Sequence, residues 1–305
     1  MMAREKDRQQ RIEQAGVLRW DAIHTSLGSS RRDRPNVGAA HSIGKLLPIG
    51  AGSPGPAMAS PAGSEHPIAS TWPWIMFQGW RNLLFYSWPV SRTALAGLLP
   101  PGLPVDQFQG SGWVSLVPFA MHDLHLRCLP PIPGTSSFPE VNLRTYVRLR
   151  NEPGVFFFSI DAASCLGALV ARAVFHLPYF RAGIRLDQQG NEFRITSLRR
   201  SHVGSPPARL VASWRPRGTL RRPAAGTLEH FLLERYASFA PGPPGELYRG
   251  ALLHSDWQVQ GADAELSSTS LIEAAGLAPP ANVVCHFSPG VDTRVYPVQR
   301  VPVAG

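Results

Sequence analysis

Residues 138–149, FPEVNLRTYVRL, form the segment that most limits how this chain can fold. Apolar and polar residues alternate along it, and a period of two predicts a β-strand because successive side chains of a strand point to opposite faces. One face of this strand carries Val141, Leu143 and Val147. The other face carries four hydrogen-bonding side chains, which we call the polar row: Glu140, Asn142, Arg144 and Tyr146.

The polar row has three interpretations. It is the lining of a chamber, a structural hydrogen-bonding network, or a solvated surface. A buried polar group without a partner costs roughly 1–3 kcal/mol, so a buried row must be satisfied by neighbours, water or a ligand. The apolar face can pack beneath flanking helices, which leaves the polar face free to line an interior. We therefore favour the chamber.

A turn signal follows the strand and predicts its partner. Residues 151–154, NEPG, contain turn-forming residue types, and residues 155–162, VFFFSIDA, read as the returning strand. A two- or four-residue loop at this turn places Tyr146 opposite Ser159 and Arg144 opposite Asp161. The register thus predicts an ion pair for Arg144. Asp161 also stands where it can cap a predicted helix over residues 162–175.

The rest of the chain predicts many short strands and few helices. Its 30 prolines and 28 glycines interrupt regular structure frequently. Two further helices are expected at residues 92–99 and, after an N-cap at Thr227, at residues 228–239. Strands are expected at 81–90, 111–121, 208–216, 246–260, 282–289 and 292–298, with a hairpin over 181–200 that turns at Gly190. We predict an α+β, β-rich domain whose sheet curls into a barrel or cone.

The chain divides into two parts by composition. Residues 1–71 include GAGSPGPAMASPAGSEHP, which buries too little apolar surface to offset its ordering entropy. This part is expected to be a disordered extension, or sequence added by an over-long gene start. Residues 72–305 are expected to form a single domain.

The charge and the cysteine content indicate which kinds of partner and which cellular compartment to expect. The formal charge is +9, but the arginines are scattered and no basic helix is present, which argues against a nucleic-acid partner. The most apolar run, residues 154–175, is broken by Asp161 and Arg172 and is too polar to span a membrane. Three widely spaced cysteines fit a reducing compartment. We predict a cytoplasmic protein without membrane or nucleic-acid partners, and the sequence leaves a homo-oligomer open.

Three common catalytic or cofactor-binding motifs are missing from the sequence. It has no GxSxG elbow, no Walker phosphate loop and no GxGxxG fingerprint, which lowers the expectation of a serine hydrolase, a P-loop enzyme or a dinucleotide oxidoreductase. His122, His125 and Cys128 are zinc-ligand types at a spacing of three. They run into a proline pair and lack a clear fourth ligand, so we interpret them as a solvated loop. We predict no metal and no cofactor.

Four other side chains are weaker candidates for a cavity. They are His176, Tyr179, His254 and Trp257. A lone histidine is more often a hydrogen-bonded structural residue than a functional one.

Several long segments resemble one family. WRNLLFYSWPV, LLPPGLPVDQFQGSGWVSLVPFAM, LPPIPGTSSFPEVNLRTYV, PGVFFFSIDA, ARAVFHLPYF and LEHFLLERY resemble, in this order, the YqjF-like family of uncharacterised bacterial proteins. The resemblance spans roughly residues 74–300. That family is similar in fold to acetoacetate decarboxylase, which implies an antiparallel β-barrel or cone with a central cavity and about three peripheral helices.

The lysine content of the chain argues against the decarboxylase mechanism. Acetoacetate decarboxylase uses a lysine that forms a Schiff base with a β-keto acid. The only lysines here are Lys6 and Lys45, so residues 46–305 contain no side-chain amine. Two hypotheses follow: an enzyme that acts on a small organic acid or carbonyl compound without a covalent amine, or a non-catalytic barrel that binds a small ligand in a regulatory role.

Both hypotheses use the same residues. Arg144 would bind the carboxylate of an anionic small molecule, because its planar guanidinium matches carboxylate geometry. In the enzyme, Glu140 would be the general acid or base, with a pKa raised by burial. The remaining site residues would orient the ligand or hold Arg144 in place: Asn142, Tyr146, Ser159 and Asp161.

Overall fold

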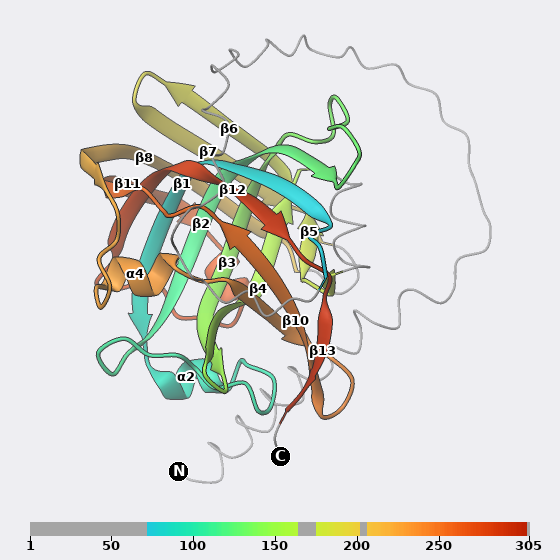
Figure 1. The fold of residues 1–305 in the computed structure, drawn as a ribbon. Helices are drawn as coiled ribbons and strands as arrows, with labels where there is room; N and C mark the ends of the chain where they lie inside the picture. Colours follow the sequence, from blue (N-terminus) through green and yellow to red (C-terminus); the bar gives the residue numbers. More distant parts are fainter. Residues whose placement is uncertain (1–71, 164–174, 202–205, 304–305) are drawn as a thin grey trace, which may run out of the picture.

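The computed structural model describes residues 72–163, 175–201 and 206–303 (Figure 1). The prediction for residues 1–71 and most of the predicted helix at 162–175 lie outside this part of the chain. The strands are β1 (Met76–Val90), β2 (Gly112–Leu126), β3 (Phe138–Leu149), β4 (Glu152–Ala162), β5 (Tyr179–Arg181), β6 (Gly183–Gln189), β7 (Glu192–Arg199), β8 (Ala208–Arg221), β9 (Ala237–Pro241), β10 (Glu246–His254), β11 (Val259–Thr269), β12 (Val284–Val295) and β13 (Gln299–Pro302). The described helices are α2 (Arg92–Ala96), α4 (Leu228–Leu233) and α5 (Leu271–Ala274).

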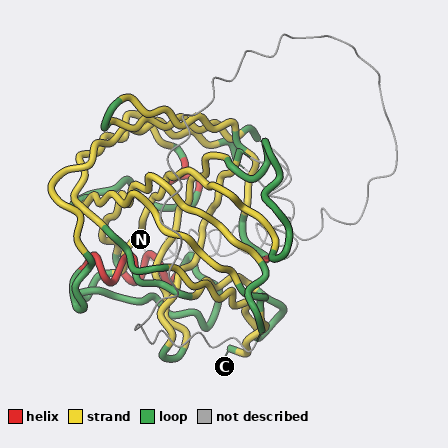
Figure 2. Tube along the Cα trace, turned by 45° about the horizontal axis from the view of Figure 1, so that its top comes forward, coloured by secondary structure: helices red, strands yellow, loops and turns green. Residues whose placement is uncertain are grey.

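Seven strands close into a ring. Their order is β10-β9-β4-β3-β2-β1-β12, and β12 pairs again with β10. From β12 the sheet continues through β11, β8 and β7 to β6, and we call these four strands the wing. Figure 2 shows that strands make up most of the described chain and that the helices are short. The prediction of a β-rich α+β fold with a curled sheet is confirmed, although β4 pairs in parallel with both β5 and β9 rather than antiparallel.

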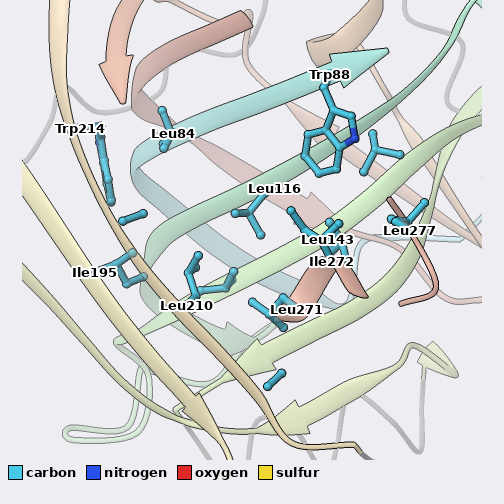
Figure 3. Close-up of a cluster of buried hydrophobic side chains, with 14 of the residues drawn as sticks. Leu84, Trp88, Leu116, Leu143, Ile195, Leu210, Trp214, Leu271, Ile272 and Leu277 are labelled. Atoms are coloured by element: carbon cyan, nitrogen blue, oxygen red, sulfur yellow. The ribbon is translucent and has the colours of Figure 1, made fainter. Parts of the chain in front are cut away.

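The main hydrophobic core lies between the outer face of the ring and the wing. Leu84, Trp88 and Leu143 from the ring pack with Ile195 and other side chains of the wing (Figure 3). The short helix α5 adds Leu271 and Ile272 to this cluster, and all of these side chains are buried. Val141 and Leu143 of the apolar face of β3 are therefore covered by the wing and α5, whereas Val147 packs in a second cluster with Phe156 and Phe239. The polar face of β3 is directed into the ring.

The hairpin between β3 and β4 has a different register from the one expected. Leu149 pairs with Glu152, so the turn consists of Arg150 and Asn151, and Arg150 adopts the left-handed conformation with a φ of 56°. Arg144 consequently pairs with Phe157. The pairing then shifts by one residue between Arg144 and Leu143, because Leu143 pairs with Ser159.

The predicted pairs Tyr146–Ser159 and Arg144–Asp161 were therefore wrong. Tyr146 lies opposite Val155, and Asp161 lies opposite Val141. The turn comes earlier than the NEPG signal suggested because Glu152 already belongs to β4, where its carboxylate pairs with Arg249 of β10.

Asp161 pairs instead with an arginine of the wing. Its carboxylate accepts a hydrogen bond from Arg199 of β7, and both side chains are buried, at 0% and 3% exposure. The Arg199 guanidinium also lies 4.2 Å from the centre of the Phe180 ring. This ion pair joins ring strand β4 to the wing.

The segment after Thr227 is helical over a shorter range than predicted. Thr227 caps α4 as expected, because its hydroxyl accepts a hydrogen bond from the His230 N–H at 3.3 Å. The helix ends at Leu233, whereas the prediction extended it to residue 239. Residues of β9 pair with β4 instead, with Ser238 opposite Val155, so sheet pairing overrides the local helical pattern. No helix within the described ranges is long and apolar enough to cross a membrane.

Candidate functional site

The ring encloses a cavity. Every ring strand contributes side chains to its wall, together with β5 and the segments around α4 and Trp257. The space open to the centres of water molecules is about 90 Å³, and one water needs about 10–15 Å³ on that measure, so several waters or a small organic molecule fit inside. Most of the wall is apolar. The polar residues that line it are Gln78, Glu140, Asn142, Arg144, Tyr179, Arg235, Ser238 and His254.

Three members of the polar row line this cavity. Glu140, Asn142 and Arg144 are all buried and face it. Tyr146 is fully buried beside them but is not part of the wall. Its hydroxyl hydrogen-bonds to that of Ser115 at 2.6 Å, and Ser115 bonds in turn to Ser87 at 2.7 Å. This buried hydroxyl chain holds the Tyr146 ring in place between β3 and its neighbours.

Arg144 is a buried cation without a carboxylate partner. It is 8% exposed, and no carboxylate of the described residues lies within ion-pairing distance of it. One guanidinium nitrogen donates to the backbone oxygen of Leu232 at 3.2 Å, whereas its Nε has no partner. The guanidinium also lies 5.5 Å from the Phe85 ring and 5.7 Å from the Tyr146 ring. Since burying an unpaired charge is costly, this arginine favours an anion in the cavity.

A second arginine lies at the same end of the cavity. Arg235 donates to Asp106 at 2.6 Å and to the backbone oxygen of Phe231 at 2.7 Å, and it lies 5.2 Å from the Tyr146 ring. Burial lowers the pKa of Arg235, while Asp106 opposes this shift. The charge of Arg235 is thus compensated by Asp106, in contrast to that of Arg144.

Sequence reasoning missed Arg235. It placed this arginine within the predicted helix at residues 228–239 and gave it no role, because nothing local distinguishes it from a solvated arginine. The end of α4 and the pairing of β9 with β4 turn it inward, and both depend on distant strands.

Glu140 is a buried carboxyl group with a strongly shifted pKa. It is 2% exposed, and burial raises its pKa from 4.5 to about 8. The hydrogen bond from Asn142 lowers the pKa in part, while the negative charge of Asp161 raises it further. Glu140 Oε2 and Asn142 Oδ1 have no partner within the described structure. These two oxygens are therefore available to a ligand.

The weaker candidates divide between the cavity wall and other places. Tyr179, His254 and Trp257 line the cavity, and burial followed by the charge of Glu140 raises the pKa of Tyr179 well above its usual value. His176 is not part of the wall and stacks on Tyr248, with ring centres 3.7 Å apart.

Ser159 and Asp161, which were expected to bind substrate, are buried but do not line the cavity. Their absence from the wall follows from the β3–β4 register, which places Ser159 opposite Leu143. Asp161 still influences the site electrostatically through its effect on Glu140. Among the described residues, no group of three or more His, Cys, Asp and Glu side chains is arranged to hold a metal.

Comparison with known proteins agrees with this fold. The family model DUF2071, described as an uncharacterized conserved protein, matches residues 77–292. The uncharacterized protein YqjF of Bacillus subtilis is 36% identical over 228 residues, which cover 74% of this chain and 93% of YqjF.

Two solved structures share the architecture at low sequence identity. The enduracididine biosynthesis enzyme MppR, solved in complex with pyruvate, aligns with a TM-score of 0.54 at 13% identity over 77% of this chain and 93% of MppR. Acetoacetate decarboxylase from Legionella pneumophila aligns with a TM-score of 0.51 at 17% identity over 76% of this chain and 89% of its own. At this identity the likeness concerns the fold alone. The sequence matches show that the chain belongs to the DUF2071 family of YqjF-like proteins, and the structural likeness shows that it has an acetoacetate decarboxylase-like fold.

Proposed function

We propose that this protein binds a small carboxylic acid inside the ring, with the carboxylate on Arg144, and that Glu140 transfers a proton to or from the bound molecule. The observation that carries the proposal is a buried guanidinium that faces the cavity without a carboxylate partner among the described residues. A carboxylate ligand supplies the missing charge and matches the planar geometry of the guanidinium.

The pKa of Glu140 suits acid–base chemistry. A catalytic acid or base is most effective when its pKa lies near the working pH, and burial brings the pKa of Glu140 to about 8. Near neutral pH both protonation states are then populated. Asn142 lies two residues away on the same face and orients the ligand beside this carboxyl group. Because residues 46–305 contain no lysine, the chemistry proceeds by proton transfer without a Schiff base to a side chain.

The apolar wall supports the alternative of a binding protein without turnover. Phe119, Phe157 and Trp257 line the cavity and would retain the hydrocarbon part of a ligand whether or not a reaction follows. In this alternative Arg144 and Asn142 only orient the ligand, and occupancy of the ring has a regulatory role. Measured turnover decides between the two.

Replacing Arg144 by alanine is expected to weaken the binding of carboxylate ligands at least tenfold, which corresponds to roughly 1.4 kcal/mol. The ligands are first identified by native mass spectrometry of freshly purified protein and by a screen of keto acids and related metabolites. Affinities are then measured by calorimetry. Arg185→Ala serves as the control, because this arginine is exposed on β6 and lies outside the cavity. Equal affinities for a correctly folded Arg144→Ala variant and the wild type would reject the carboxylate site.

Replacing Glu140 by glutamine is expected to preserve the fold and abolish turnover. The substitution keeps the shape and removes the titrating proton. The measurement follows each acid that binds, by nuclear magnetic resonance in D₂O, for hydrogen exchange at carbon and for product formation. Turnover that persists in Glu140→Gln removes Glu140 from the catalytic role. If the wild type binds acids and converts none of them, the protein is a binding protein without turnover.

A further inference from the structure

Two polar groups of the cavity wall, Arg144 and Glu140, define two separate ends. Arg144 is tied to α4 through its bond to the Leu232 backbone oxygen, and Arg235 lies beside the same Tyr146 ring. We call this the arginine end. Glu140 lies next to Tyr179 of β5, whose pKa it influences, and we call this the oxygen end.

The two ends are far apart on the scale of a small acid. Glu140 and Arg144 are four residues apart on one strand, which places their Cα atoms roughly 13 Å apart at about 3.3 Å per residue. Arg144 bonds to the Leu232 backbone oxygen of α4, whereas Glu140 is hydrogen-bonded to Asn142. Among the described residues, no hydrogen bond or ion pair joins Glu140 to Arg144. Asn142 lies between them on β3 and its side chain bonds to Glu140, while Val117 of β2 stands opposite it. Phe119, which pairs with Glu140, and Phe157, which pairs with Arg144, add apolar side chains to the wall at the two ends.

We propose, on the basis of the function proposed above, that the natural ligand is an oxo or hydroxy carboxylic acid whose second oxygen group is separated from the carboxylate by an apolar chain of several carbons. A 2-oxo or 3-oxo acid places its two polar groups too close together to reach both ends. The ligand instead lies along β3, with its carboxylate at Arg144, its methylene groups against the apolar wall and its second oxygen at Glu140 and Asn142.

The side chains at the oxygen end favour an uncharged oxygen group of the ligand. A protonated Glu140 donates a hydrogen bond, while the unpartnered Oδ1 of Asn142 accepts one. A ligand hydroxyl satisfies both, and a ligand carbonyl accepts the bond from Glu140. A second carboxylate is disfavoured here, because the negative charge of Asp161 already raises the pKa of Glu140. We therefore expect dicarboxylic acids of the same length to bind more weakly.

The size of the cavity determines which acids are suitable as test ligands. The open space holds roughly six to nine water-sized groups, and a six-carbon oxo acid is about as large. The test uses calorimetry with freshly prepared 2-, 3-, 4- and 5-oxohexanoate, which share composition and charge and differ only in the position of the carbonyl. Hexanoate, 5-hydroxyhexanoate and hexanedioate complete the series.

The expected order follows from the separation of the two ends. Binding tightens as the carbonyl moves away from the carboxylate, with 5-oxohexanoate at least tenfold tighter than 3-oxohexanoate, hexanoate and hexanedioate. The compound 5-hydroxyhexanoate ranks with 5-oxohexanoate. In Asn142→Ala the preference for 5-hydroxyhexanoate over hexanoate falls at least fivefold, while Arg144→Ala weakens every acid in the series. Arg185→Ala provides the matched control for folding and surface charge.

The outcomes separate the two proposals. If 2- or 3-oxohexanoate binds most tightly and Arg144→Ala still weakens it, the extended ligand is wrong and the carboxylate site stands. If hexanedioate binds as tightly as 5-oxohexanoate, the neutral oxygen end is wrong. If Arg144→Ala leaves all affinities unchanged, or if none of the acids binds, both proposals fail.

Discussion

Replacing Asp161 by alanine is expected to lower the free energy of unfolding by about 3–5 kcal/mol, because removing one partner of a buried ion pair leaves the other charge uncompensated. The partner is Arg199, which is 3% exposed and has no second carboxylate within the described structure. The pair joins ring strand β4 to wing strand β7, so the loss affects the packing of the wing on the ring. Chemical denaturation of the variant and the wild type, followed by tryptophan fluorescence, measures the difference.

Two further variants test the explanation. Asp187→Ala removes a surface ion pair with Arg185, whose side chains are 45% and 78% exposed, and is expected to cost no more than about 1 kcal/mol. The double variant Asp161→Leu with Arg199→Met removes both charges. It is expected to recover most of the lost stability, because burial raises the pKa of Asp161 despite Arg199, so solvation is lost without full compensation. A double variant as unstable as Asp161→Ala would contradict the charge argument.

The ligand-free protein is expected to lose stability as the pH rises from about 4.5 to about 8, through Glu140. Its pKa is raised from 4.5 in the unfolded reference to about 8 in the fold, so the folded state holds the proton more tightly. The contribution is fully present below pH 4.5, is lost progressively through this interval and stays lost above it. A shift of this size amounts to up to about 5 kcal/mol.

The measurement is the difference between wild type and Glu140→Gln at each pH, because other groups of the protein also titrate. Glutamine stays neutral, so the variant gains stability relative to the wild type between pH 4.5 and 8. Glu265→Gln, a change at an exposed position of β11, is expected to follow the wild-type curve. Parallel curves for the wild type and Glu140→Gln would show that the Glu140 carboxyl group is not desolvated in the fold.

The prediction of the fold succeeded where the signal was local. The alternation in residues 138–149 correctly placed Glu140, Asn142 and Arg144 on one inward face, because a period of two is a property of the strand itself. The same holds for the N-cap at Thr227 and for the hairpin that turns near Gly190. Each of these depends on residues within a few positions of one another.

Prediction failed where the pairing between strands decided the structure. The hairpin register depended on an early turn at Arg150 and on a shift within the pair, which moved Asp161 away from Arg144. The helix predicted after Thr227 ended early because β9 pairs with β4. In both cases the pairing between strands outweighed the preference of a short segment.

The sequence by itself determined that this chain forms a β-rich fold with a strand that carries four polar side chains on one face, and that its domain offers no lysine for a Schiff base. Only the tertiary structure decided which charges meet. It paired Asp161 with Arg199, brought Arg235 to the cavity and left Arg144 without a carboxylate. The physical reason is that ring closure and strand register set the distances between side chains far apart in the chain, and the strength of an electrostatic interaction depends on those distances and on burial.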